Sequence, residues 1–131
     1  MAMTLASRLT DATANPVVVA EISGNHNGSF TRFLDLIRAA ADCGVDAVKF
    51  QTYTADTITL PVDTGAFRIS GDHPLWSGAR LYDLYEQAHT PWEWHAEGFS
   101  LARELGIDAF SSPFDESATD FLEALNPPAY K

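Results

Sequence analysis

VVVAEISGNHNG, residues 17–28, opens the part of the sequence that decides the fold. Its first six residues form a near-continuous apolar run that is rich in β-branched residues and too short for a helix, which predicts a buried strand of a parallel sheet. The polar, glycine-rich residues that follow predict a turn. The next apolar residues recur at the spacing of one helix face: Phe30, Phe33, Leu34, Ile37 and Ala41. Strand, loop and helix in this order are typical of α/β proteins.

The same unit occurs again along the chain. The first predicted helix ends at Cys43, where Gly44 can take the left-handed conformation, and a second strand follows over Val45 to Gln51. The motif GVDAV at residues 44–48 reappears as GIDAF at residues 106–110, which predicts a third strand over Ile107 to Ser111. The tail, residues 127–131, resembles the start of a fourth strand. We therefore expect an α/β fold, the N-terminal portion of a (β/α)8 TIM barrel with about three βα units and the start of strand four, not closed within this chain.

Two more helices carry start signals. Thr90, Pro91 and Glu93 have the spacing of a capping box, with the proline at the first helical position. The apolar stripe expected for that helix is Trp94, Leu101, Ala102 and Leu105. Asp115 is placed to cap a final helix that would bury Ala118, Phe121, Leu122 and Leu125.

Two stretches stand outside this repeat. Residues 1–16 lack the features of a secretion signal and are expected to be an untidy leader before a domain over residues 17–131. Residues 52–89 are too long for an ordinary βα loop and include a short amphipathic helix from Leu81 to Ala88. Long insertions after strands often build ligand sites, so Trp76 is either a packing residue or part of a sugar pocket.

Composition excludes several classes of function. The chain has 131 residues, 46% of them hydrophobic, and no apolar run long enough to span a membrane, so the cytoplasm is the default expectation. A net charge of −10, with six arginines and two lysines, argues against nucleic acid as a partner. Cys43 is the only cysteine and is expected to be a buried structural thiol.

Polar side chains converge on one rim of the predicted sheet. Residues two apart share a face of a strand, so Glu21 on the first strand and Lys49 and Gln51 on the second lie together at the carboxyl ends. The third strand adds Ser111, with Ser112 at the turn, and the fourth adds Lys131. Parallel α/β folds hold ligands at this rim, which makes this convergence the strongest sign of a site.

Structural explanations compete with functional ones at most of these positions. A buried Lys49 must be paired or must bind an anion, and Glu21 can be either a ligand-facing group or its ion-pair partner. Lys131 is either a site residue or an ordinary exposed lysine at a chain end. Asn25, His26 and Asn27 can face a ligand or simply form a turn, and Ser111 and Ser112 can donate to phosphate or carboxylate oxygens or simply end a strand. His73, His89 and His95 have no metal-binding spacing and are expected in structural or surface roles.

Five motifs resemble, in order and spacing, the N-terminal part of the sialic acid synthase family: AEISGNHNGS, VDAVKFQTYT, LWSGARLYDLYEQAHTPWEW, FSSPFD and PPAYK. The resemblance implies a (β/α)8 barrel followed by a small antifreeze-like domain, assembled as a domain-swapped homodimer. This chain would hold part of the barrel domain and lack the antifreeze-like domain.

The resemblance also implies a reaction. Such enzymes condense phosphoenolpyruvate with an open-chain N-acetylated amino sugar to give a nine-carbon α-keto acid and phosphate, helped by a divalent metal such as Mn²⁺ or Mg²⁺. By the family motifs Glu21, Lys49 and Gln51 are catalytic candidates, and Asn25, Ser112 and Lys131 are substrate-binding candidates. Lys49, Ser112 and Lys131 would hold phosphoenolpyruvate, whereas Glu21 and Gln51 would face the sugar and a metal-bound water.

Parts of that machinery are not expected within this chain. The family's metal ligands are histidines on later strands and its sugar-contacting arginine is in the antifreeze-like domain, so we expect no metal ligands here and no synthase activity from this chain alone. The tract from Leu75 to Trp94 favours the branch that uses 2,4-diacetamido-2,4,6-trideoxy-altrose over those that make N-acetylneuraminic or legionaminic acid. Two other classes stay open: a non-catalytic α/β binding or assembly module, and a barrel lyase that forms a Schiff base at Lys49.

Overall fold

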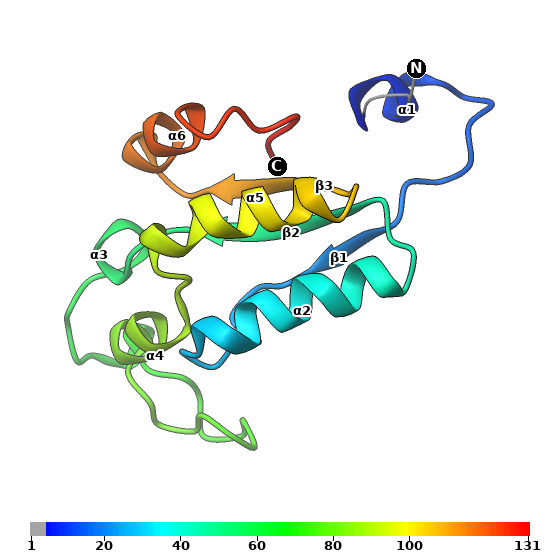
Figure 1. Ribbon diagram of the computed structural model, residues 1–131. Helices are drawn as coiled ribbons and strands as arrows, with labels where there is room; N and C mark the ends of the chain where they lie inside the picture. Colours follow the sequence, from blue (N-terminus) through cyan, green and yellow to red (C-terminus); the bar gives the residue numbers. More distant parts are fainter. Residues whose placement is uncertain (1–4) are drawn as a thin grey trace.

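Three parallel strands form an open sheet at the centre of the molecule (Figure 1). The structure is a computed structural model that describes residues 5–131. The strands are β1 (Val19–Glu21), β2 (Ala47–Thr52) and β3 (Asp108–Pro113), in the order β1-β2-β3. The predicted parallel α/β fold is confirmed, although each strand begins slightly later than expected.

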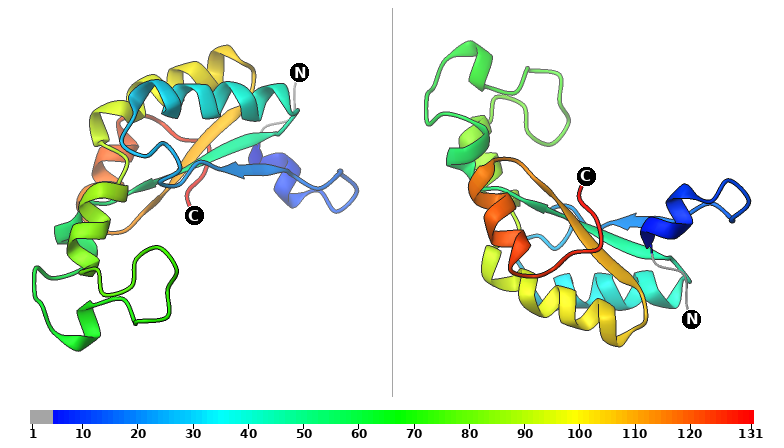
Figure 2. Two further views of the ribbon diagram at one scale, coloured as in Figure 1. Left: turned by 90° about the horizontal axis from the view of Figure 1, so that it is seen from below. Right: turned by 90° about the horizontal axis from the view of Figure 1, so that it is seen from above.

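Helices α2 (Phe30–Asp42) and α5 (His95–Glu104) lie side by side along one face of the sheet, and α6 (Glu116–Glu123) follows β3 (Figures 1 and 2). The cap of α6 is the predicted one, because the Asp115 carboxylate accepts the Ser117 and Ala118 amides at 3.2 and 3.1 Å. In α2 the Ser29 hydroxyl accepts the Arg32 amide at 3.2 Å.

The start of α5 differs from the prediction. A 3₁₀ turn, η2 (Trp92–Trp94), precedes the helix, and the Thr90 hydroxyl contacts His26 instead of capping the helix. A 3₁₀ turn winds more tightly than an α-helix and so rotates the following residues about the axis. The buried face of α5 is therefore His95, Gly98, Phe99 and Ala102, and Leu105 of the predicted stripe is exposed.

The core lies between the sheet and these helices. Its buried members are Ile22, Phe33, Ile37, Ala40, Val48, Phe50, Phe99, Ala102, Ala109 and Leu122. Helices α2 and α5 approach closely at Gly98, where an added Cβ would come within 2.7 Å of the Phe33 ring. This glycine has a packing role, because only a residue without a side chain fits there.

The long segment between β2 and α5, predicted over residues 52–89 and called the insertion below, lies beyond the carboxyl ends of the strands (Figure 1). It contains α3 (Ala55–Ile58), a 3₁₀ turn η1 (Gly65–Phe67) and α4 (Leu81–Ala88), and the last of these is the amphipathic helix that the sequence predicts. An isolated antiparallel bridge joins Arg68 to Arg80, and the Arg68 guanidinium pairs with Asp63. The insertion thus has internal structure of its own.

The two ends of the described chain both contact the sheet. The expected leader contains α1 (Leu5–Thr10), in which Leu5 is buried and Arg8 pairs with Asp46 at the start of β2; residues 1–4 of that leader lie outside the described residues. The predicted start of a fourth strand is present as a parallel bridge between Ser111 and Tyr130. Lys131 continues it, donating its amide to the Ser111 carbonyl at 3.2 Å.

The prediction for Cys43 is wrong. Cys43 is exposed, because it caps α2 beyond Ala40, the last buried residue of that helix, and Gly44 turns the chain there with φ of 76°.

None of the helices in the described residues is both long and apolar enough to cross a membrane.

Candidate functional site

The sheet face opposite the α2–α5 layer carries the predicted site residues. Glu21 pairs in register with Lys49, and Gln51 pairs with Ser112, so these four residues share one face of neighbouring strands. Val48, Phe50 and Thr52 alternate with them and point to the helix-covered face. We call the first the open face and the second the covered face.

Lys49 is a buried cation on the open face. Its side chain is 6% exposed, and its Nζ donates to Glu21 Oε1 at 2.6 Å, whereas the Glu21 side chain is 61% exposed. Glu21 is therefore the ion-pair partner of Lys49, which is one of the two roles expected for it from the sequence. The pair lowers the pKa of the Glu21 carboxyl, first through the hydrogen bond, then through the charge of Lys49, with a smaller effect from Lys131.

The ammonium group of Lys49 is not saturated by this contact. It has three donors, and Glu21 accepts the one hydrogen bond that the described residues give it. An ammonium held in an ion pair is an electrostatic anchor and not a nucleophile, so the geometry favours anion binding over a Schiff base.

Ser112 provides the clearest sign that a ligand is needed. Its side-chain oxygen is buried and has no hydrogen-bond partner among the described residues. Buried hydroxyl groups are almost always hydrogen-bonded, so an unpaired one on a face that also holds a buried cation points to a missing acceptor.

Ser111, weighed as a second donor, is engaged elsewhere. It lies on the covered face, where its hydroxyl is 2.7 Å from Thr52 Oγ1. The strand continues through both serines to Pro113, so alternation sends their side chains in opposite directions. Only Ser112 joins the open face.

Lys131 extends this set at the edge of the sheet. The bridge between Ser111 and Tyr130 is parallel, so the register places Lys131 next to Ser112. Its side chain is exposed, and its charge is close enough to lower the pKa of Glu21. Two lysines and one free hydroxyl thus gather around the carboxyl ends of β2 and β3.

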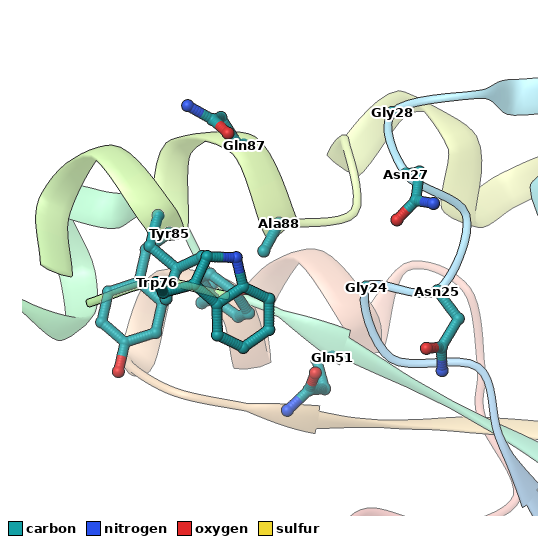
Figure 3. Close-up of a pocket in the computed structure, with 11 residues that line it drawn as sticks. Gly24, Asn25, Asn27, Gly28, Gln51, Trp76, Tyr85, Gln87 and Ala88 are labelled. Carbon is teal, nitrogen blue, oxygen red and sulfur yellow. The ribbon is translucent and has the colours of Figure 1, made fainter. Parts of the chain in front are cut away.

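A cavity of about 620 Å³ adjoins the open face and extends toward the insertion. Figure 3 shows Trp76 and Tyr85 at one end, Asn25 and Asn27 of the loop after β1 at the other, and Gln51 of β2 between them. Amides and aromatic rings in such a cavity suit a polar ligand with an apolar part. Trp76, expected either to pack or to line a sugar pocket, lines this pocket.

Gln51 belongs to both groups of residues. It lines the pocket and is the register neighbour of Ser112. Asn25 lies only in the pocket, where its Nδ2 donates to the Ile22 carbonyl at 3.0 Å. The predicted site residues therefore form two adjoining subsites, one cationic and one lined by amides.

His95, one of the histidines expected in structural or surface roles, is buried near this site. His95 Nδ1 lies 3.2 Å from the Pro91 carbonyl, and its Nε2 lies 2.9 Å from Thr52 Oγ1. Burial lowers the pKa of His95 to about 4, so the ring is neutral at pH 7. Its spacing with Gly98, Phe99 and Ala102 is the signal that could have identified a buried position.

His26 is also buried and does not face a ligand. The turn interpretation is confirmed, because residues 23–28 form turns and the Ser29 amide donates to the His26 carbonyl at 3.0 Å. The ring itself packs edge-on against Phe33 and Trp94 inside the protein. Burial, and then the charge of His89, lowers the pKa of His26.

The residues that the structure describes do not fit a resident divalent metal. Residues 5–131 contain no group of three or more His, Cys, Asp or Glu side chains placed to hold one.

A parallel α/β unit with an anion-binding group and a polar pocket at the carboxyl ends of its strands is a ligand-binding unit of the kind that enzymes use. Residues 36–131 match the NeuB family, and the chain belongs to that family.

The relatives identify the branch that this chain resembles. It is 47% identical over 114 residues to pseudaminic acid synthase of Campylobacter jejuni subsp. jejuni serotype O:2, which covers 87% of this chain and 33% of that protein. It is 47% identical over 116 residues to pseudaminic acid synthase of Helicobacter pylori, covering 88% of this chain and 34% of that protein. The chain therefore spans about a third of the length of these curated relatives.

Solved structures agree on the fold. Spore coat polysaccharide biosynthesis protein SpsE of Bacillus subtilis superposes with a TM-score of 0.63 at 29% identity, over 90% of this chain and 29% of that one. N-acetylneuraminic acid synthetase of Leptospira borgpetersenii superposes with a TM-score of 0.66 at 24% identity, over 86% of this chain and 34% of that one.

Proposed function

We propose that this chain is the phosphoenolpyruvate-binding part of a pseudaminic acid synthase, a transferase of sialic-acid-like sugar biosynthesis. The observation that carries the proposal is the buried Lys49 ammonium on the same sheet face as the buried Ser112 hydroxyl, which has no hydrogen-bond partner among the described residues. The 47% identity to two pseudaminic acid synthases supports this choice of reaction.

The cationic subsite would hold phosphoenolpyruvate. The ligand carries a phosphate and a carboxylate, and anions of this kind are recognised by cations and hydroxyl donors. Lys49 keeps two donors beyond the Glu21 contact, Ser112 keeps its hydroxyl, and Lys131 adds a second positive charge. Because the chain carries a net charge of −10, attraction of an anion would depend on this local group of cations.

The adjoining pocket would hold the sugar, proposed to be 2,4-diacetamido-2,4,6-trideoxy-altrose in its open-chain form. Gln51 and Asn25 offer amide groups for hydroxyl and acetamido groups, and Trp76 and Tyr85 offer aromatic surface for methyl groups. Because Gln51 lies in both subsites, the two ligands would meet beside it.

The reaction balances without a redox step. C3 of phosphoenolpyruvate forms a bond to the aldehyde carbon of the sugar, the aldehyde oxygen gains a proton, a water oxygen adds to C2, and the C2–O bond to phosphate breaks. The products are the nine-carbon α-keto acid and inorganic phosphate. Glu21, the exposed member of the ion pair, would face the sugar and the water that adds to C2.

The complete enzyme is part of the same proposal. We expect the open sheet to belong to a (β/α)8 barrel domain, with an antifreeze-like domain and a homodimer completing the site. A divalent metal, Mn²⁺ or Mg²⁺, would be held by residues outside those described. Residues 17–131 would then be a partial barrel domain of a cytoplasmic enzyme, inactive alone because it spans about a third of its relatives.

Calorimetry with phosphoenolpyruvate tests the proposal. We expect weak but measurable binding to the wild-type chain. Lys49→Met keeps the apolar part of the side chain and removes the charge, so it should weaken binding by about tenfold or more, the effect of losing a charge-assisted hydrogen bond.

The matched control is Arg103→Ala, which removes one positive charge from the exposed end of α5, at the opposite end of the strands. This variant should bind as the wild type does. Absence of binding to the wild type, or an equal loss in both variants, would reject the proposal and favour a binding or assembly module of another kind.

Competition experiments choose among the possible sugars. The diacetamido-altrose should bind more tightly than a hexosamine that carries a single acetamido group. The reverse order would assign the chain to an N-acetylneuraminate branch of the family.

A further inference from the structure

The insertion returns to the sheet at Thr90–Trp92, and three separate parts of the protein hold this short segment. His26, from the loop after β1, lies with its Nε2 3.1 Å from Thr90 Oγ1. His95 holds the Pro91 carbonyl at 3.2 Å, and the Trp92 indole donates to the Tyr53 carbonyl at 3.2 Å. The segment is therefore fixed relative to both the loop and the sheet.

The hydrogen bonds of His26 define its protonation. Its Nδ1 accepts the backbone N–H of Gly28 at 3.1 Å, so in the neutral ring the proton is on Nε2, which donates to Thr90 Oγ1. Both ring nitrogens are satisfied although the side chain is fully buried. One imidazole thus joins its own loop to the end of the insertion.

The loop that His26 holds has a strained backbone. Ser23 and Asn27 have positive φ values of 47° and 48°, which cost non-glycine residues roughly 1 kcal/mol or more each and persist only where surrounding contacts enforce them. Asn27 lies between His26 and Gly28, the two residues joined by the Nδ1 contact. That contact is therefore well placed to maintain the strain.

The loop and α4 also approach closely at a second point. A Cβ at Gly24 would lie 2.8 Å from the Ala88 carbonyl oxygen and 3.4 Å from the Ala88 methyl carbon. Gly24 and Ala88 both line the pocket, and Figure 3 shows them between the Asn25 side and the Tyr85 side of it. The distance between the loop and α4 therefore sets the width of the pocket.

We propose that His26 and Thr90 form a latch that positions the loop after β1 against α4 and so sets the geometry of the pocket for the acceptor sugar. Both are positioning residues, because neither lines the pocket. The inference rests on the proposed function for the identity of the ligand. It adds that the polar groups of Asn25 and the rings of Tyr85 and Trp76 match an acetamido sugar only while the hydrogen bond between His26 and Thr90 is formed.

Paired substitutions at Thr90 test the latch. Thr90→Val removes the hydroxyl with little change in shape, and Thr90→Ser retains it. Thr119→Val is the matched control, since it removes a hydroxyl that bonds to the Asp115 carbonyl on α6. Calorimetry with 2,4-diacetamido-2,4,6-trideoxy-altrose should show about tenfold weaker binding for Thr90→Val, the loss of one buried hydrogen bond, and wild-type binding for the other two. Phosphoenolpyruvate binding should stay within about twofold in all three.

Nuclear magnetic resonance without ligand tests directly whether the latch holds the loop against α4. One Gly24 Hα points toward Ala88, where an added Cβ would lie 2.8 Å from the carbonyl oxygen and 3.4 Å from the methyl carbon, so the wild-type chain should give a nuclear Overhauser effect between this Hα and the methyl protons. Thr90→Val should lose this signal and Thr90→Ser should keep it, while signals between the Phe50 and Phe99 rings of the core stay in every variant.

The two measurements separate the two claims. If the wild type does not bind the sugar, the proposed function fails, and the Gly24–Ala88 signal alone decides the latch. If the wild type binds the sugar and Thr90→Val binds it equally well, the latch is rejected while the function stands. Persistence of the Gly24–Ala88 signal in Thr90→Val also rejects the latch. Equal weakening of both ligands would assign Thr90 a general structural role and overturn the inference.

Discussion

The two faces of the sheet satisfy their polar groups in opposite ways, and Ser111 and Ser112 show the difference within two consecutive residues. On the covered face the Ser111 hydroxyl meets Thr52, which also meets His95, so each polar atom has a partner from the protein. On the open face the Ser112 hydroxyl has no partner among residues 5–131. A network closed on itself stabilises a fold, whereas a buried donor without an acceptor indicates a place for a ligand.

Truncation of a core side chain should give the largest difference in unfolding free energy between the two faces. Phe50→Ala on the covered face removes a fully buried ring that packs against Phe33 and Phe99, and should lower the free energy of unfolding by about 3–5 kcal/mol. Lys49→Met on the open face should change it by about 1 kcal/mol or less, since the partner Glu21 is mostly exposed. Urea denaturation followed by circular dichroism measures both. Equal losses would mean that the open face is a second core.

The loss of stability between pH 6.5 and 4 should come mainly from the covered face. The pKa of His95 falls from an ordinary 6.5 to about 4 because burial disfavours the charged ring. Above pH 6.5 the folded and unfolded chains are both neutral at this residue, and its contribution to stability is fully present. As the pH falls from 6.5 to 4 the unfolded chain binds a proton that the folded chain does not, so roughly 3 kcal/mol of unfolding free energy should be lost.

His95→Gln removes this titration and leaves the lowered pKa of His26 in place. Chemical denaturation at a series of pH values should therefore give a shallower slope for this variant between pH 4 and 6.5. An unchanged slope would contradict the assignment of the acid sensitivity to His95.

The two neighbouring serines give the smallest and most closely matched comparison. Ser111→Ala should cost about 1–2 kcal/mol, because it leaves Thr52 without one of its partners in a buried network. Ser112→Ala removes an atom that has no hydrogen-bond partner in the described part of the chain and should change stability by about 0.5 kcal/mol or less. Thermal unfolding of the two variants measures the difference. A larger loss for Ser112→Ala would show that its hydroxyl has a structural partner.

The sequence predicted most of the fold because its signals are local. Alternation of apolar runs and helical stripes identified the three strands, α2, α4 and α6, and the position of Glu21, Lys49 and Gln51 on one face. The errors arose where a contact between residues far apart in the sequence determines the local conformation. Thr90 has the spacing of a cap, but its hydroxyl is drawn to His26, 64 residues away.

The site was predictable only in part for the same reason. Assigning Ser112 to the open face required the end of β3, which the sequence placed at Ser111, two residues before its observed end at Pro113. The burial of His26 and His95 depends on aromatic neighbours from other helices, such as Phe33, Trp94 and Phe121. No spacing within the sequence contains that information.

Titration of the isotope-labelled chain with phosphoenolpyruvate, followed by nuclear magnetic resonance of side-chain signals, tests the central claim most directly. We predict that the side-chain signals of Lys49, Gln51 and Ser112 shift together with one dissociation constant, while those of Phe50 and His95 on the covered face do not. Shifts spread over both faces, or confined to the arginines of the insertion, would contradict the account.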